Sequence, residues 1–314
     1  MATHHIQPTP ATVRRGMFDA SFPPILTVQS GDTVVLECVS GRKEVLPPPE
    51  SGLTIPLALR AIIDADLPSL AGHILTAPVA VDGAEPGDML EIRIEAIELG
   101  ADWGYNMISA LAGTLPEDFH ATTLTHLPVD RERKICTMPW GTELSLSPFF
   151  GVMGVAPPPE FGRISSKEPR VHGGNLDNKE LVAGTTLYLP IFVDGALFSA
   201  GDGHAVQGDG EVCINAIETG LVGRFRLTVR DDMRLEWPYA ETPTHVVTMA
   251  FDPDLDDCVV VALRLMLDVI QRRAGLTRSH AYMLASLAAD LRITQVVNGN
   301  KGVHVMLDKK YLKR

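Results

Sequence analysis

The segment from residue 201 to residue 211 holds the densest set of side chains that could do chemistry. It reads Gly-Asp-Gly-His-Ala-Val-Gln-Gly-Asp-Gly-Glu, so three carboxylates, an imidazole and an amide are interspersed with four glycines. Asp202 and His204 are two residues apart, and in an extended segment their side chains project to one side. This pair suits a divalent cation of hard or borderline character, and the glycines would leave room for a ligand to approach. A tight turn stabilised by aspartate side chains is the structural alternative.

Two further segments offer groups of the same kind. The run from His172 to Asp177, His-Gly-Gly-Asn-Leu-Asp, combines an imidazole, an amide and a carboxylate beside a Gly-Gly turn. His73 lies in the run Gly-His-Ile-Leu-Thr-Ala-Pro. All three segments fall near predicted boundaries between strands and loops, where functional sites are commonly built. Taken alone, His73 or His172 could also be a loop histidine whose hydrogen bonds have only a structural role.

Covalent catalysis by serine or cysteine is an alternative to a metal. Leu-Phe-Ser-Ala-Gly at 197–201 lacks one glycine of the Gly-x-Ser-x-Gly elbow and the helix that must follow it. Ser165-Ser166-Lys167 has the residue types of a serine–lysine pair, but the run is short. Cys213 is better placed than Cys136, because a strand from residue 211 would direct it to the same side as Glu211. A buried structural cysteine explains it more simply.

Strands must position these groups, and the sequence predicts a mainly β fold. Gly87 to Glu98 alternates apolar and charged residues, as in a strand with one buried face. We also expect strands near 26–38, 185–193, 211–218 and 224–229. The sequence predicts three regions, which are an irregular N-terminal arm (1–24), a mainly β region carrying the active site (25–257) and a C-terminal α+β element packed on it (258–314).

The C-terminal region has clear helix signals. An apolar run of helical length from Val259 to Arg273 is followed by Gly275, a typical C-cap. Thr277 or Ser279 can cap a second helix that runs to about Leu291. Residues 41–69 and 146–180 are rich in proline or glycine and are predicted as loops, while residues 101–126 have only weak periodicity.

Composition excludes several classes of protein. The 314 residues are 45% hydrophobic and 21% charged, which is typical of a globular chain. A formal net charge of −12 argues against nucleic acid as a partner. No run approaches the length of a membrane span, and the N-terminus lacks the pattern of a signal peptide, so we expect a cytoplasmic protein without a membrane partner. The four cysteines form no Cys-x-x-Cys pair, so a sulfur-ligated zinc site is not expected.

These motifs, taken together, resemble the acetamidase/formamidase family. The resemblance rests on the His172–Asp177 run, on Gly195 to Val212, on Val-Asp-Gly-Ala-Glu-Pro-Gly-Asp-Met-Leu at 81–90 and on segments at 151–157 and 281–293. It covers the chain from about residue 25 to 312, with the motifs in the family's order. It departs at Ala77, where the family usually has glycine. The chain length favours the acetamidase branch.

The resemblance implies a β-sandwich of jelly-roll type, hydrolysis of short aliphatic amides, a divalent metal and a homo-oligomer, with a dimer as the first expectation. Zinc is the first choice for the metal, with calcium or manganese as alternatives. Carried onto this chain, the metal-site candidates are His73, Asp177, Asp202, His204 and Glu211, together with Glu218 as a weaker one.

We therefore hypothesise that a metal-activated water attacks the amide carbon. Glu211 is the first choice for the carboxylate that transfers the proton, and Asp209 is the second. Asn175 or Gln207 would donate a hydrogen bond to the developing oxyanion. One rival is a non-catalytic jelly-roll module that binds sugar or metal, although aromatic residues make up only 6% of the chain. Another rival is a hydrolase or lyase for a different amide-like substrate.

Overall fold

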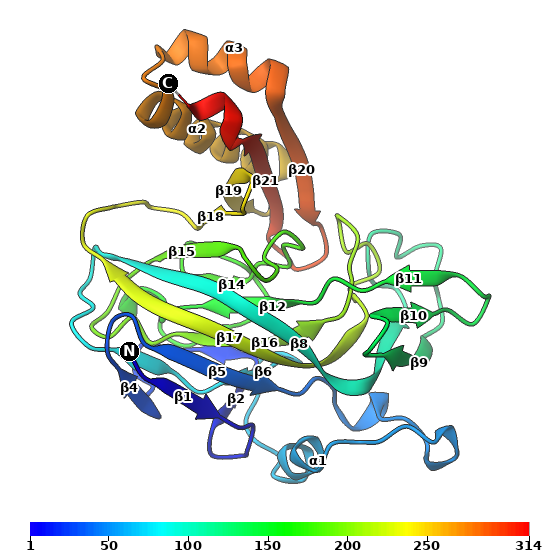
Figure 1. Ribbon diagram of the computed structural model, residues 1–314. Coiled ribbons are helices and arrows are strands. Elements are labelled where there is room, and N and C mark those ends of the chain that lie inside the picture. Colours follow the sequence, from blue (N-terminus) through cyan, green and yellow to red (C-terminus); the bar gives the residue numbers. More distant parts are fainter. Residues whose placement is uncertain (314) are drawn as a thin grey trace.

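The computed structural model describes residues 1–313, which form a mainly β molecule. Figure 1 shows a body of long strands from which the C-terminal element, coloured orange to red, projects on one side, while helix α1 (Leu57–Asp64) lies on the opposite side. The prediction of a mainly β fold is confirmed. No helix within residues 1–313 has the length and apolar character needed to cross a membrane.

One layer of the body is built from long antiparallel strands, with one short parallel strand at its edge. The predicted alternation after Gly87 is confirmed, because Leu90, Ile92 and Ile94 are fully buried whereas Arg93 between them is exposed. In spatial order the strands of this layer are β1 (Thr3–Ile6), β5 (Thr33–Cys38), β17 (Glu218–Arg230), β8 (Met89–Ile108) and β15 (Thr186–Pro190).

A second layer packs against the first. Phe150 of the second layer stacks edge-on against Phe225 of β17, with 5.2 Å between ring centroids. Burying such large side chains from both layers builds the main core. The jelly-roll topology stays a prediction. In spatial order the strands of this layer are β14 (Gly173–Asn175), β12 (Phe149–Gly154), β16 (Ser199–His204), β6 (Ile74–Thr76) and β2 (Val13–Arg15).

The C-terminal element has its own core, in which α2 (Leu255–Ala274) packs on a small antiparallel sheet. Both predicted caps are present: Gly275 ends α2 in the left-handed conformation, and the Thr277 side chain accepts the His280 N–H at the start of α3 (Arg278–Ala288). The sheet includes strands that precede residue 258. In spatial order its strands are β18 (Tyr239–Glu241), β19 (His245–Asp252), β21 (Lys301–Asp308) and β20 (Ala289–Gln295).

The remaining elements are short or peripheral. Three strands extend β8 at one end of the body, and two small two-stranded sheets lie at its margin. They are β9 (Thr123–Asp130), β10 (Ile135–Thr137), β11 (Glu143–Ser145), β3 (Met17–Phe18) with β13 (Ile164–Ser165), β4 (Leu26–Val28) with β7 (Val79–Val81), and the 3-10 helices η1 (Lys43–Val45), η2 (Pro49–Ser51), η3 (Pro159–Phe161) and η4 (Lys309–Leu312).

Several local predictions were wrong. Residues 1–24 are not an irregular arm, since β1, β2 and β3 lie there and His4 Nε2 contacts Asp32 Oδ2 at 3.1 Å. Residues 146–180 contain β12 and β14, and β12 is buried at every residue, so it has no alternation to detect. Residues 211–217 form a loop, and β17 begins only at Glu218. Residues 41–69 contain α1.

Candidate active site

The groups singled out in the sequence meet where the two layers join. β16 ends at His204 and β17 begins at Glu218, and these two residues form the ladder pair that connects the layers. On the other side of β16, Gly201 pairs with β6. This pairing brings His73, which immediately precedes β6, next to Asp202. Residues far apart in sequence are thus placed together by strand register.

Two histidines and two carboxylates form the centre of the site. His204 Nε2 lies 3.3 Å from Asp202 Oδ2 and 3.3 Å from Glu218 Oε1. His73 Nε2 lies 3.9 Å from the same Asp202 oxygen. Asp202, His204 and Glu218 are buried, while His73 is partly exposed. These four side chains therefore direct nitrogen and oxygen atoms toward one small region.

Gln207 holds the His204 ring in place. The Gln207 Nε2 group donates to the backbone oxygen of Asp177 at 2.8 Å, which leaves Gln207 Oε1 to accept the His204 Nδ1–H at 2.9 Å. This bond leaves Nε2 as the free nitrogen, and Nε2 has no hydrogen-bond partner among the described residues. The amide of Gln207 is used at both ends, so it orients His204 and does not offer the predicted donor to an oxyanion.

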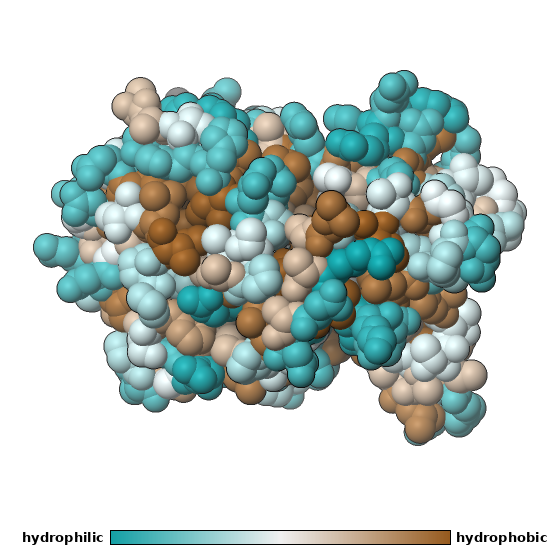
Figure 2. Space-filling view, turned by 90° about the horizontal axis from the view of Figure 1, so that it is seen from below, coloured by the Kyte–Doolittle hydropathy of each residue, from teal (hydrophilic) through white to brown (hydrophobic). Residues whose placement is uncertain are grey.

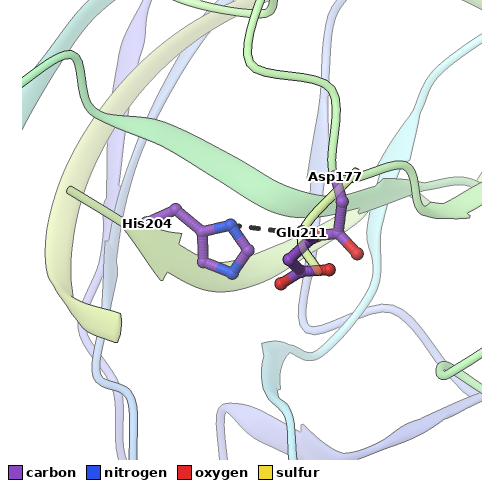
Figure 3. Close-up of side chains that lie close together, drawn as sticks. All are labelled: Asp177, His204 and Glu211. Atoms are coloured by element: carbon purple, nitrogen blue, oxygen red, sulfur yellow. Dashed lines mark ion pairs between the residues drawn. The ribbon is translucent and has the colours of Figure 1, made fainter. Parts of the chain in front are cut away.

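Asp177 and Glu211 form a second pair of carboxyl groups beside the ring of His204 (Figure 3). Asp177 Oδ1 lies 3.9 Å from His204 Nδ1, and Asn298 Nδ2 donates to Asp177 Oδ2 at 2.5 Å. Burial raises the pKa of Asp177 to about 6. Burial, together with the neighbouring Asp177 carboxyl, raises the pKa of Glu211 well above its usual range. One carboxyl of this pair therefore retains a proton readily.

At the centre of the site, Asp202 and His204 both favour their charged forms. Burial alone would lower the pKa of His204, but the carboxylates of Glu218 and Asp202 outweigh it and raise the pKa well above its usual range. Burial alone would raise the pKa of Asp202, but the imidazoles of His73 and His204 hold it below its usual range. The site thus favours charged groups at its centre and a protonated carboxyl at its side.

Three carboxylates of the site have a strained backbone. Asp177, Asp202 and Glu211 have φ values of 43°, 60° and 46°, in the left-handed region that residues other than glycine rarely adopt. Such strain persists only when the surrounding structure enforces it, and it is common at functional sites. The fold therefore holds these three side chains in orientations that regular strands would not provide.

Gly151 of β12 forms the floor of the cluster. A Cβ atom at this position would lie 2.6 Å from Asp177 Oδ1, 2.7 Å from Asp202 Oδ2 and 2.8 Å from His204 Cε1. The absence of a side chain keeps open the space among these atoms. Gly203 has a different role from the one expected: its missing side chain admits the neighbouring strand β17, since a Cβ would lie 2.4 Å from the Thr219 oxygen.

The cluster opens into a cavity of about 280 Å³. Asn175 lines it; one Nδ2 hydrogen is donated to the Lys167 oxygen at 3.3 Å, and Oδ1 has no hydrogen-bond partner among the described residues, so Oδ1 can accept from a ligand. Asp209 does not belong to the cavity lining; its carboxylate pairs with Lys179 at 3.4 Å. The polar lining includes Ser40, Arg42, His73, Lys167, Asn175, Asp202, Glu211, Asn215, Glu218 and Asn298.

Sequence reasoning missed three residues of the site. Gly151 carries no functional group, and Asn298 lies outside the recognised motifs. Ser166, considered as a nucleophile, is fully buried and its Oγ bonds His73 Nδ1 at 2.7 Å, so it orients that ring. Cys213 lies outside any strand, in the 211–217 loop. Of the three missed residues, Gly151 and Ser166 lie within or near recognised motifs and could have been considered as small residues that shape the site. No local signal singles out Asn298.

The donor set fits a divalent cation. Four buried carboxyl groups, on Asp177, Asp202, Glu211 and Glu218, have no lysine or arginine ion-pair partner among residues 1–313. Burying that much negative charge is costly unless cations compensate it. Two sets of three ligand atoms lie within 4.8 Å of one another, namely Asp202 with His204 and Glu218, and Asp177 with His204 and Glu211.

Fold and site together define a mainly β protein with a buried carboxylate–histidine centre at the junction of two strand layers. Residues 14–168 and 163–307 match the acetamidase/formamidase family, so the chain belongs to this family. The recognition made from the motifs is confirmed.

Named relatives agree with this assignment. A crystal structure of an acetamidase from Bacillus halodurans superposes with a TM-score of 0.84 at 33% identity, covering 98% of both chains. The formamidase of Methylophilus methylotrophus is 30% identical over 60% of this chain and 57% of its own length. The acetamidase of Mycolicibacterium smegmatis is 31% identical over 47% of this chain and 51% of its own length. The alignments thus span little more than half of these two relatives.

Proposed function

We propose that the protein is an amidohydrolase that cleaves the carbon–nitrogen bond of short aliphatic amides, such as acetamide and formamide, to a carboxylate and ammonia. The observation that carries the proposal is one cavity lined by His73 and three buried carboxyl groups, those of Asp202, Glu211 and Glu218, with His204 and Asp177 directly beside them. Family membership supports the reaction class, since two relatives are named as a formamidase and an acetamidase.

We propose that His73, Asp202, His204 and Glu218 hold a divalent cation. Two imidazole nitrogens and two carboxylates favour zinc, with manganese as an alternative, while calcium prefers a shell of oxygens alone. Asp177, also expected as a ligand, lies on the Nδ1 side of His204, the side that Gln207 occupies. When bound, the cation would polarise the amide oxygen and lower the pKa of a water toward about 7.

Glu211 is the residue we propose for proton transfer. Its carboxyl lines the cavity, lies beside Asp177 and has one oxygen with no hydrogen-bond partner in the described chain. In its ionised form Glu211 would accept a proton from the attacking water, and its raised pKa would let it hold that proton until it is returned to the departing nitrogen. Asn175 Oδ1, which has no hydrogen-bond partner among the described residues, accepts an N–H of the substrate.

A larger amide is the second candidate substrate. Acetamide, with four non-hydrogen atoms, occupies on the order of 100 Å³ if each atom takes about the share of a water molecule. The cavity of about 280 Å³ therefore has room for a longer acyl group. Leu70, Ile74, Tyr105, Met107 and Ile214 provide an apolar part of the wall for such a group.

Ammonia release from a series of amides tests the proposal. The series runs from formamide through acetamide and propionamide to benzamide, with each assay repeated after chelator treatment and after metal is restored. We expect release from the short amides, loss with chelator and recovery with zinc. Peak activity on propionamide or benzamide would favour the larger substrate. No release from any amide by metal-loaded protein would rule out the amidohydrolase proposal.

A further inference from the structure

Tyr105 of β8 lines the cavity of the candidate site and brings a hydrogen-bond donor to it. The two amides expected to donate to an oxyanion are otherwise used: Gln207 bonds at both ends, and Asn175 presents an acceptor oxygen to the cavity. A donor directed at the oxygen where negative charge develops is usually the largest single contribution to this kind of catalysis. The Tyr105 hydroxyl is in a position to fill this role.

Strand register places Tyr105 beside the carboxylate–histidine cluster. Glu218 of β17 pairs with His204 of β16 on one side and with Tyr105 of β8 on the other. Side chains that face each other across antiparallel strands lie on the same face of the sheet, with their Cβ atoms about 5 Å apart. His204, Glu218 and Tyr105 therefore form a row on one face of three neighbouring strands.

The ring of Tyr105 is fixed by the core. It belongs to the cluster of buried side chains that includes Leu59 and Ile62 of α1, and its centroid lies 6.4 Å from that of Trp103. Figure 2 shows this side of the molecule from outside, where apolar side chains are mixed with hydrophilic ones. Tyr105 as a whole is only 8% exposed. Close packing of this kind leaves the ring little freedom to move, so its hydroxyl keeps one position.

The hydroxyl group of Tyr105 has no hydrogen-bond partner among residues 1–313, although its oxygen is not fully enclosed. Buried tyrosines usually have such a partner, so a ligand is expected to supply it here. Burial raises the pKa of Tyr105 well above its usual range; the carboxylates of Glu218 and Asp202 raise it further, and Arg42 opposes them. The hydroxyl therefore lies within the electrostatic reach of two proposed metal ligands.

The two cationic donors of the cavity lining are less suited to bind an oxyanion. The Arg42 side chain is 47% exposed and contacts Glu44 at 3.5 Å, and Lys167 is also exposed. A donor acts most strongly on a developing charge where water is excluded, because the local dielectric is low there. Tyr105 meets this condition, since its ring is buried and its strand neighbour is the buried Glu218.

We propose that the Tyr105 hydroxyl donates a hydrogen bond to the substrate amide oxygen and that this bond strengthens as the oxygen becomes an oxyanion. The proposal rests on the amidohydrolase function proposed above. When water adds to the amide carbon, one of its protons goes to Glu211 and the π electron pair of the C=O bond moves onto the oxygen that Tyr105 contacts. When the C–N bond breaks, that pair re-forms the C=O bond, and the nitrogen takes the proton from Glu211 and leaves as ammonia. Tyr105 keeps its own proton throughout.

Tyr105→Phe tests the proposal, because it removes the hydroxyl and keeps the ring. We expect kcat for acetamide to fall about 100-fold, as on loss of one oxyanion donor, while KM changes by less than about threefold. Methaneboronic acid, which adds water to become tetrahedral like the intermediate, should bind the variant more weakly by a similar factor in calorimetry. Zinc content and the temperature of unfolding should match the wild type, since the hydroxyl has no partner to lose among the described residues.

Tyr188→Phe is the matched control, because Tyr188 of β15 is a partly buried tyrosine that does not line the cavity. Its kcat, KM and boronate binding should equal those of the wild type. Wild-type kcat in Tyr105→Phe would overturn the role of Tyr105 and leave the amidohydrolase function standing. A loss of kcat accompanied by an equal loss of zinc would also overturn it, because Tyr105 would then support the metal site. A wild type that releases no ammonia from any amide would reject the proposed function, and the role of Tyr105 with it.

Discussion

At the scale of single residues, the site needs a glycine as well as its charged side chains. Gly151 leaves a space bounded by Asp177, Asp202 and His204, and the strained backbones of Asp177 and Asp202 turn their carboxylates toward it. Left-handed conformations at such residues cost on the order of 1–3 kcal/mol each, so the surrounding strands must enforce them. The proposed cation would offset the repulsion among the carboxylates.

Replacing Gly151 with alanine tests this arrangement. The added methyl group would come within 2.8 Å of three atoms of the cluster, which must then move apart. We expect Gly151→Ala to bind zinc at least about tenfold more weakly, as is common when the support of a metal site is disturbed. Zinc titration and metal analysis of the purified variant would measure this loss.

Gly208→Ala is the control for that experiment. A Cβ at residue 208 meets nothing within 4 Å, although Gly208 belongs to the same glycine-rich segment as His204. This variant should bind zinc as the wild type does. Equal zinc affinity in Gly151→Ala and the wild type would contradict the proposed location of the cation.

At the scale of secondary-structure elements, strand β21 carries a buried histidine that links folding to pH. His304 Nδ1 bonds Thr294 Oγ1 at 2.7 Å, and the charges that act on its pKa are those of Glu180, Arg292 and Lys179. Burial lowers the pKa of His304 to about 4, with Arg292 and Lys179 acting in the same direction and Glu180 opposing them. The folded protein therefore keeps this imidazole neutral where the unfolded chain protonates it.

This difference in the pKa of His304 between the folded and unfolded states predicts that the free energy of unfolding decreases in acid. Because the folded pKa lies below the unfolded value of about 6.5, the contribution is intact above pH 6.5 and declines as pH falls toward 4. We expect His304→Asn, which retains an acceptor for Thr294, to flatten the fall by about 1.4 kcal/mol per pH unit. Urea unfolding between pH 4 and pH 7 would measure it.

His120→Asn, at an exposed position, is the matched control and should leave the pH dependence of unfolding unchanged. If His304→Asn has the same slope as the wild type in this range, His304 is protonated in the folded state and the assignment is wrong.

At the scale of the whole molecule, the C-terminal element forms part of the candidate active site. Asn298 lies in the loop between β20 and β21, lines the cavity and donates to Asp177 Oδ2 at 2.5 Å. Arg292 of β20 also contacts Glu180 of the body at 3.1 Å. The element therefore orients a carboxyl group of the candidate site.

We expect Asn298→Ala to lower kcat/KM for acetamide by about 10- to 100-fold, since a hydrogen bond to a charged group contributes about 1.5–3 kcal/mol. Asn300→Ala is the control, because Asn300 donates to the Pro169 oxygen and does not line the cavity. Amide hydrolysis and thermal unfolding of both variants would be compared. Equal loss of activity in the two variants would show a general effect on the element instead of a role for Asn298.

The sequence by itself indicated which side chains could build the candidate site. Asp202 and His204 were identified because their types, spacing and flanking glycines are local properties, and the family followed from the order of such motifs. The same holds for the caps of α2 and α3 and the alternation of β8, since capping and pleating act over a few residues.

Tertiary structure decided which of these groups meet and how each is used. Asp209 is only two residues from Gln207, yet it pairs with Lys179 outside the cavity while Gln207 orients His204. Gly151 and Asn298 enter the site through strand register and the docking of the C-terminal element. Contacts between distant segments depend on the packing of the whole core, and no local pattern of residue types encodes them.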